Sequence, residues 1–120
     1  MPIVRADIPH GYSDEQKRAI HTALKQAIIT ALAPKETKYI YVALRDVFAD
    51  VGDGAPTVTV DLRPGREAER KAALAKAIAG AFGAAAGIDA ADIYLLFREN
   101  NAANHYCGGA PLADWVPADA

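Results

Sequence analysis

The stretch Pro2-Ile3-Val4-Arg5-Ala6-Asp7-Ile8 recurs 54 residues later as Pro56-Thr57-Val58-Thr59-Val60-Asp61-Leu62. Proline opens both copies, β-branched residues follow, and an aspartate stands sixth in each. The match continues through Gly11 and Gly65. The second copy is then one residue shorter, and residues 40–46 align with residues 93–99. Ordered self-similarity of this kind indicates a duplicated structural unit. We therefore predict one domain, residues 1–120, made of two repeats, 2–50 and 56–107, with a C-terminal tail, 108–120.

Each copy has the pattern of a strand, a tight turn, a helix and a second strand. Residues 2–8 and 56–62 are short and rich in β-branched side chains, as strands are. Ser13 and Gln16 have the spacing of a capping box, so a helix is expected to begin after Ser13. Apolar residues then recur at helical spacing in both copies. A strand–helix–strand crossover makes its two strands parallel. The prediction is an α/β (α+β) fold, a duplicated β-α-β unit whose four-stranded mixed sheet carries two helices on one face.

The second strand of each unit indicates that the other sheet face is also covered. Residues 40–44 and 93–97 are apolar without the alternation of a strand that has one face in water. Nothing else in the chain is left to cover that face, so we predict self-association. The alternative is a face of aromatic and aliphatic side chains that tolerates water.

Composition excludes several classes of protein. The net charge is −2, and no run of basic residues exceeds two, which argues against a surface that neutralises nucleic-acid phosphates. The uncharged run 77–88 is well short of the roughly 20 residues that a membrane span needs. Arg5 and Asp7 interrupt any signal-peptide core, so a cytoplasmic protein is expected. The single cysteine, Cys107, excludes an intramolecular disulfide. No residues have metal-ligand spacing or form a phosphate loop, so no metal and no cofactor are expected.

Pro2 is the first candidate for chemistry. An initiator methionine is commonly removed before a small residue, and loss of Met1 would expose a secondary amine. An α-amino group has a pKa of about 7.7–8.0, and apolar walls or nearby cations lower it. Such an amine can act as a general base, a general acid or a nucleophile. The alternative is that proline simply fits the start of a strand.

Two arginines mark the point where the copies diverge. Arg63 and Arg66 stand where the first copy has Pro9 and Tyr12. They flank a turn that leads into a helix N-terminus, where main-chain N–H groups add partial positive charge. A pair of planar guanidinium groups suits one carboxylate and a second developing negative charge. The alternative is a solvated turn, paired with the glutamates that follow.

Taken together, Pro2, the Gly11 turn, the helix start Ser13-Asp14-Glu15-Gln16-Lys17-Arg18 and the repeat resemble the tautomerase superfamily, of which 4-oxalocrotonate tautomerase is the simple member. The second half is similar to the α subunit of trans-3-chloroacrylic acid dehalogenase over residues 61–66, at the strand end 98–99 and over residues 112–117. The resemblance implies a fused β-α-β chain that forms a homotrimer. It also implies that Pro2 is the catalytic group once Met1 is removed, and that Arg63 and Arg66 hold the substrate carboxylate.

One residue departs from the dehalogenase pattern. Cys107 stands where that enzyme has its water-activating glutamate, and a neutral thiol, with a pKa around 8.5, is a poor base toward water. Hydrolytic dehalogenation is therefore in doubt. Cys107 also lacks a triad that would make it a nucleophile. The segment 100–107 is expected to lie over the site, where His105 either donates to an oxyanion or replaces an aromatic wall. Tyr94 is expected to shape the apolar wall around Pro2.

Three functions remain open. The first is a cofactor-independent tautomerase of small 2-oxo or enol carboxylic acids, with Pro2 as general base. The second is a hydratase or dehalogenase of 3-haloacrylate-like acids, or a decarboxylase of malonate semialdehyde, with protonated Pro2 as acid. The third is a non-catalytic oligomeric binding protein, because fold does not fix function.

Overall fold

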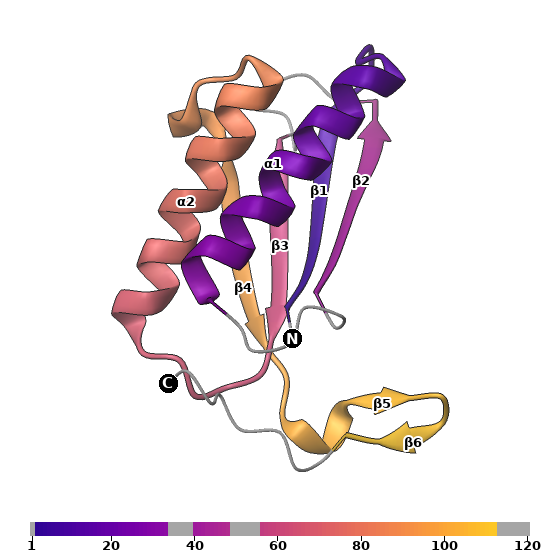
Figure 1. Ribbon diagram of the computed structural model, residues 1–120, viewed down its shortest axis with the longest axis vertical. Helices are drawn as coiled ribbons and strands as arrows, with labels where there is room; N and C mark the ends of the chain where they lie inside the picture. The colour runs from indigo at the N-terminus through magenta and orange to yellow at the C-terminus, as the bar shows by residue number, and fades with distance from the viewer. Residues whose placement is uncertain (1, 34–39, 49–55, 113–120) are drawn as a thin grey trace.

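Two β-α-β units make up the chain in the computed structural model, which describes residues 2–33, 40–48 and 56–112 (Figure 1). The first unit contains β1 (Ile3–Pro9), α1 (Asp14–Leu32) and β2 (Tyr41–Val47). The second contains β3 (Thr57–Leu62), α2 (Ala68–Ala86) and β4 (Tyr94–Glu99). Short 3-10 turns, η1 (Ala90–Asp92) and η2 (Ala102–Asn104), stand on either side of β4, and the hairpin of β5 (Tyr106–Cys107) and β6 (Ala110–Pro111) follows. The junction 51–55, Met1 and the tail beyond 112 lie outside the described residues.

The sheet has the strand order β2-β1-β3-β4. Each unit's two strands are parallel, and the units join through antiparallel β1 and β3, with Ile3 opposite Asp61. The predicted four-stranded mixed sheet is confirmed. Because β1 and β3 run in opposite directions, the start of β1 and the end of β3 lie at one edge of the sheet.

Both helices cover the same face of the sheet (Figure 1). The predicted capping box is present: Ser13 Oγ accepts from the Gln16 main-chain nitrogen at 3.1 Å, and Gln16 Oε1 accepts from the Ser13 nitrogen at 2.8 Å. The larger apolar residues of both helices, at the predicted helical spacing, meet the sheet in one core, which includes Val4, Ile8, Ile20, Leu24, Ile28, Val58, Val60, Leu74, Ile78 and Phe82. The alanines of the predicted stripes, Ala27, Ala31, Ala77 and Ala81, lie outside this core. No helix in the described part of the chain has the length and apolar character to cross a membrane.

Among the residues that the structure describes, no helix covers the opposite face of the sheet. Tyr94 is 66% exposed and Leu96 48% exposed on this face, so the apolar second strands are left uncovered within one chain, as the sequence predicts. This face is more polar toward the two ends of the central strands than predicted. Asp7 pairs with Arg45 in the first unit, and the equivalent Asp61 pairs with Arg98 in the second. The duplication has therefore preserved a cross-strand ion pair as well as the fold.

Glycine makes the turn from strand to helix in both units. Gly11 has φ of 111° and Gly65 has φ of 120°. Side chains rarely adopt this conformation, so the glycines that align in the repeat are required by the backbone. In the second unit this turn places Arg63 and Arg66 on either side of Gly65.

Candidate active site

Pro2 is buried at the edge of the sheet where β1 begins. Its carbonyl accepts a hydrogen bond from the Tyr41 nitrogen at 3.1 Å, which extends the parallel pairing of β1 and β2 by one step. On the other side, the pairing of Ile3 with Asp61 places Pro2 beside the end of β3. Paired strands lie about 4.8 Å apart. Pro2 and Arg63, which directly follows β3, are thus neighbours within a single chain.

Arg63 and Arg66 are the buried charged residues of the described ranges. Arg63 is 2% exposed and Arg66 6% exposed, which contradicts the alternative of a solvated turn. Burial lowers the pKa of Arg63 from its ordinary value, because a desolvated guanidinium is disfavoured. Arginine still keeps its proton at neutral pH. Two positive charges are therefore held beneath the surface at the edge where Pro2 lies.

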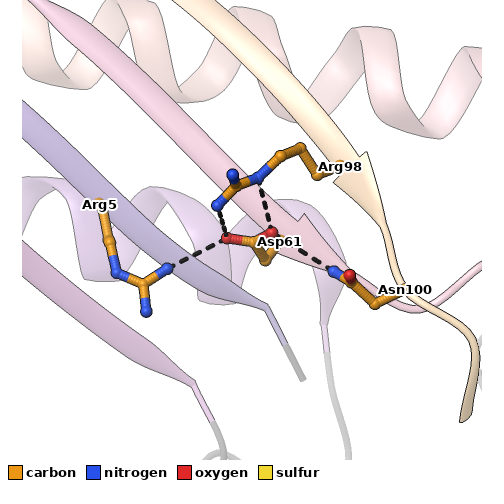
Figure 2. A network of polar contacts seen from close by, with 4 residues as sticks. All are labelled: Arg5, Asp61, Arg98 and Asn100. Carbon is orange, nitrogen blue, oxygen red and sulfur yellow. Dashed lines mark hydrogen bonds and ion pairs between the residues drawn. The ribbon is translucent and has the colours of Figure 1, made fainter. Parts of the chain in front are cut away.

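The segment after β4 returns over this edge and is fixed to it at Asn100. The Asn100 main-chain nitrogen donates to the Leu62 carbonyl at 2.8 Å, and Asn100 Nδ2 donates to Asp61 Oδ1 at 3.3 Å. Asp61 accepts two further bonds of 2.9 Å from Arg98 and one of 3.1 Å from Arg5 (Figure 2). These cations and amide hold the pKa of Asp61 below its usual range, with the Arg98 hydrogen bond the largest cause. The ion pair between Asp61 and Arg98 thus helps to hold the segment that begins at Asn100.

Hydrogen bonds also fix the far end of this segment. His105 Nε2 lies 3.0 Å from the Asn100 carbonyl, and the Leu112 nitrogen donates to the His105 carbonyl at 2.8 Å. The Leu112 carbonyl accepts from Arg63 Nη2 at 2.6 Å. The base of the β5–β6 hairpin, at His105 and Leu112, is therefore tied to the end of β3, while the hairpin residues 106–111 are exposed. The predicted boundary between repeat and tail, at residues 107 and 108, falls inside this hairpin.

A cavity of about 180 Å³ lies between the hairpin segment and the starts of β1 and β2. Its walls include Ile3, Tyr41, His105, Tyr106, Cys107 and Leu112. Pro2 and the two arginines do not line it directly. Pro2 adjoins it through Ile3, and Arg63 adjoins it through Leu112. The structure thus brings His105 and Cys107 together at the edge of the sheet that carries Pro2 and Arg63.

The structure places Tyr41 at the cavity, where the sequence analysis expected Tyr94. Tyr94 pairs with Thr57 at the start of β3, roughly 17 Å along that strand from its end at Leu62. Within one chain it does not join the cavity. Tyr41, which the sequence reasoning missed, lines the cavity instead. The repeat itself contained the signal, because Tyr41 is the first-unit equivalent of Tyr94 and parallel pairing puts the start of β2 beside the start of β1.

Residues 56–114 match the family model described as tautomerase enzyme. The second half of the chain is therefore similar to tautomerases. The matched range begins at β3, so it contains Arg63, Arg66 and the hairpin segment but not Pro2. No group of histidines, cysteines and carboxylates in the described ranges has the arrangement of a metal site.

Solved structures extend the tautomerase fold to both units. A fused 4-OT, described as a wild-type asymmetric trimer, has a TM-score of 0.82 at 17% identity and covers 92% of this chain and 95% of its own. A malonate semialdehyde decarboxylase has a TM-score of 0.70 at 24% identity, covering 88% and 90%. A malonate semialdehyde decarboxylase inhibited by 3-bromopropiolate has a TM-score of 0.67 at 25% identity, covering 88% of each chain. No curated protein matches the sequence. The predicted duplicated β-α-β fold, which these solved structures share, is confirmed, whereas the likeness to the dehalogenase stays a prediction.

Proposed function

We propose that the protein is a cofactor-independent tautomerase of small 2-oxo or enol carboxylic acids, with Pro2 as general base. The observation that carries the proposal is the burial of Arg63 and Arg66, within a tautomerase fold, at the sheet edge where Pro2 begins β1. A pair of planar guanidinium groups suits one carboxylate and a second developing negative charge. The cavity beside Leu112 suits an acid of a few carbons.

In this proposal, removal of Met1 turns the Pro2 nitrogen from a tertiary amide into a secondary amine. A buried amine close to guanidinium groups has a lowered pKa, so it is neutral near pH 7 and can take a proton. Pro2 removes the proton from carbon or from the enol oxygen and returns it at another position. Arg63 and Arg66 hold the carboxylate and stabilise the dienolate charge, an electrostatic contribution that forms a large part of such catalysis.

The active assembly we propose is a homotrimer. The uncovered sheet face, with exposed Tyr94 and Leu96, supports burial against other copies of the chain, and the fused 4-OT structures are described as trimers. Because Tyr94 lies far from its own chain's cavity, we assign it to the contacts between chains. In such a trimer, Tyr94 of one chain can shape the wall only around Pro2 of a neighbouring chain.

Intact-mass measurement of the natively expressed protein tests the proposal at its first step. A species lighter by one methionine residue supports a free Pro2 amine. Full retention of Met1 leaves an amide without basicity and favours the non-catalytic binding protein instead. Turnover is then assayed with a panel of small 2-hydroxy-enoate and 2-oxo acids, following the ultraviolet absorbance of the enol.

A decarboxylase of malonate semialdehyde, or a hydratase of haloacrylate-like acids, is the second candidate. The 25% identity over 88% of the chain to a malonate semialdehyde decarboxylase favours it, while Cys107 in place of a carboxylate base opposes hydration. The pH profile separates the two candidates, because a general base gives a rate that rises through the Pro2 pKa and a general acid gives one that falls.

A further inference from the structure

The segment after β4 ends beside the buried arginines. The Leu112 carbonyl accepts from Arg63 Nη2 at 2.6 Å, and the Leu112 nitrogen donates to the His105 carbonyl at 2.8 Å. Both main-chain polar groups of Leu112 are therefore fixed. Whatever follows Leu112 in the chain begins at the turn that carries Arg63 and Arg66.

An acidic residue stands two positions further along the chain. The sequence continues from Leu112 as Ala113-Asp114-Trp115, and these three residues lie outside the described ranges. An extended chain spans at most about 3.6 Å per residue, so the Cα atoms of Leu112 and Asp114 are separated by no more than roughly 7 Å. The Asp114 carboxylate can therefore reach the guanidinium group that bonds the Leu112 carbonyl.

Burial makes the arginine turn a strong site for a carboxylate. Arg63 and Arg66 are both almost completely buried, and an ion pair is stronger in such surroundings than in water. The planar donors of a guanidinium group also fit a carboxylate in bidentate geometry. A short linker gives a tethered group an effective concentration in the millimolar range. A carboxylate carried by the same chain thus competes with a free acid for these donors.

We propose that Asp114 occupies the arginine turn in the free protein as a tethered carboxylate, and that a substrate acid binds by displacing it. This inference rests on the proposed function, in which Arg63 and Arg66 hold the substrate carboxylate, and it names how that site is regulated. Only the fraction of molecules in which Asp114 has left the arginines is competent to bind. The apparent affinity for a small acid is reduced by that fraction.

The test measures the binding of one small acid, 2-oxobutanoate, by calorimetry at neutral pH with the full chain. We expect Asp114→Asn to bind it roughly 10- to 100-fold more tightly than the wild type does, the range of one hydrogen bond to a charged group. Asp114→Glu keeps the carboxylate and should keep the weaker binding. Asp92→Asn is the matched control, because it makes the same charge change in η1, beyond the other end of α2. Its affinity should equal that of the wild type.

A second measurement needs no variant to fold. NMR of the isotopically labelled wild-type protein follows the carboxyl carbon of Asp114 while 2-oxobutanoate is added. Its signal should shift as the site fills and stop shifting at saturation. An Asp114 signal that ignores the bound acid overturns the inference. Equal affinity in the wild type and Asp114→Asn, or no binding to either protein, overturns it as well.

Turnover is recorded separately, so that the two proposals can fail independently. A protein that shows the Asp114 effect on binding but converts no enol or 2-oxo acid contradicts the proposed function and leaves this inference standing. A protein that converts such acids while Asp114→Asn leaves the affinity unchanged contradicts this inference alone.

Discussion

Arg63 Nη2 donates a 2.6 Å hydrogen bond to the carbonyl of Leu112, 49 residues further along the chain. The same Leu112 lines the cavity, and its nitrogen donates to His105. One residue of the hairpin segment thus connects the buried guanidinium with the imidazole. The arginine and the segment over the site form one unit, so a change at Arg63 is expected to disturb both charge and cavity shape.

Replacing Pro2 with alanine tests the proposed base. We expect Pro2→Ala to lower kcat by about 10²- to 10⁴-fold, the usual contribution of a positioned acid–base group, with an unchanged circular dichroism spectrum. Pro56→Ala is the matched control, because Pro56 opens the second copy but its nitrogen is an internal amide without basicity. Wild-type turnover in Pro2→Ala on the best enol substrate would rule out the proline mechanism.

Replacing Arg63 with lysine tests the buried guanidinium. The charge is kept, but the planar set of donors is lost, so we expect kcat/KM to fall about 10- to 100-fold, mainly through KM. Loss of the Leu112 hydrogen bond should also lower the free energy of unfolding by about 1.5–3 kcal/mol. Steady-state kinetics and urea unfolding measure the two effects. Arg18→Lys, on the exposed side of α1, is the control, and equal kinetics in both variants would contradict the assigned role.

Asp61 should make the stability depend on pH in the acid range. Its pKa in the folded chain is lowered, first by the Arg98 hydrogen bond, below the value of about 3.9 in an unfolded chain. The stabilisation is therefore fully present above the unfolded pKa and is lost as the pH falls through the folded pKa. Urea unfolding measured from about pH 6 down to about pH 2 should show this loss. Asp61→Asn should flatten the same range, and an equally steep curve in the variant would show that other carboxylates are responsible.

The repeat in the sequence was enough to predict the fold, because each unit carries its own strand and helix pattern and the Gly11 and Gly65 turns align. It could not predict which strands join the units. Periodicity gives the direction of strands within a β-α-β unit, but the antiparallel pairing of Ile3 with Asp61 is a long-range contact. That pairing is what places Pro2 beside Arg63.

The sequence predicted the site less completely, because the site also depends on contacts between residues far apart in the chain. The resemblance pointed to His105 and Cys107, whereas Tyr41 reaches the cavity only because β2 pairs with β1 from its first residue. The contact of Arg63 with Leu112 had no sequence signal. Residues 100–112 are a polar, glycine-containing segment without periodicity, and only the folded chain shows where such a segment returns.

The uncovered sheet face predicts a variant that fails to assemble. Leu96→Glu places a charge on this face, and burying an unpaired charge between chains is costly. We expect a trimer in the wild type and a shift to smaller species in Leu96→Glu, measured by light scattering after gel filtration. Ala72→Glu adds the same charge on the exposed surface of α2 and should leave the assembly intact. A trimer that survives Leu96→Glu would place the interface elsewhere.

Two glycines of α2 should respond in opposite directions to alanine. A Cβ on Gly83 would lie 2.6 Å from the Ile88 carbonyl oxygen and 3.3 Å from the Ala90 nitrogen, because the chain folds back over the end of the helix there. The Ile88 nitrogen donates to the Gly83 carbonyl at 3.0 Å, so this backbone cannot move away without losing the bond. We expect Gly83→Ala to lower the free energy of unfolding by about 1–3 kcal/mol, the usual cost of overpacking.

Gly80 stands one turn earlier in the same helix, and a Cβ there meets nothing within 4 Å. Alanine restricts the unfolded chain and favours the helix, so Gly80→Ala should raise the free energy of unfolding by about 0.5–1 kcal/mol. Thermal and urea unfolding of the two variants beside the wild type measure both values. Because the amino-acid change is identical, the difference between the variants isolates the close backbone approach at Gly83. A Gly83→Ala variant as stable as Gly80→Ala would mean that the turn after α2 shifts freely to make room.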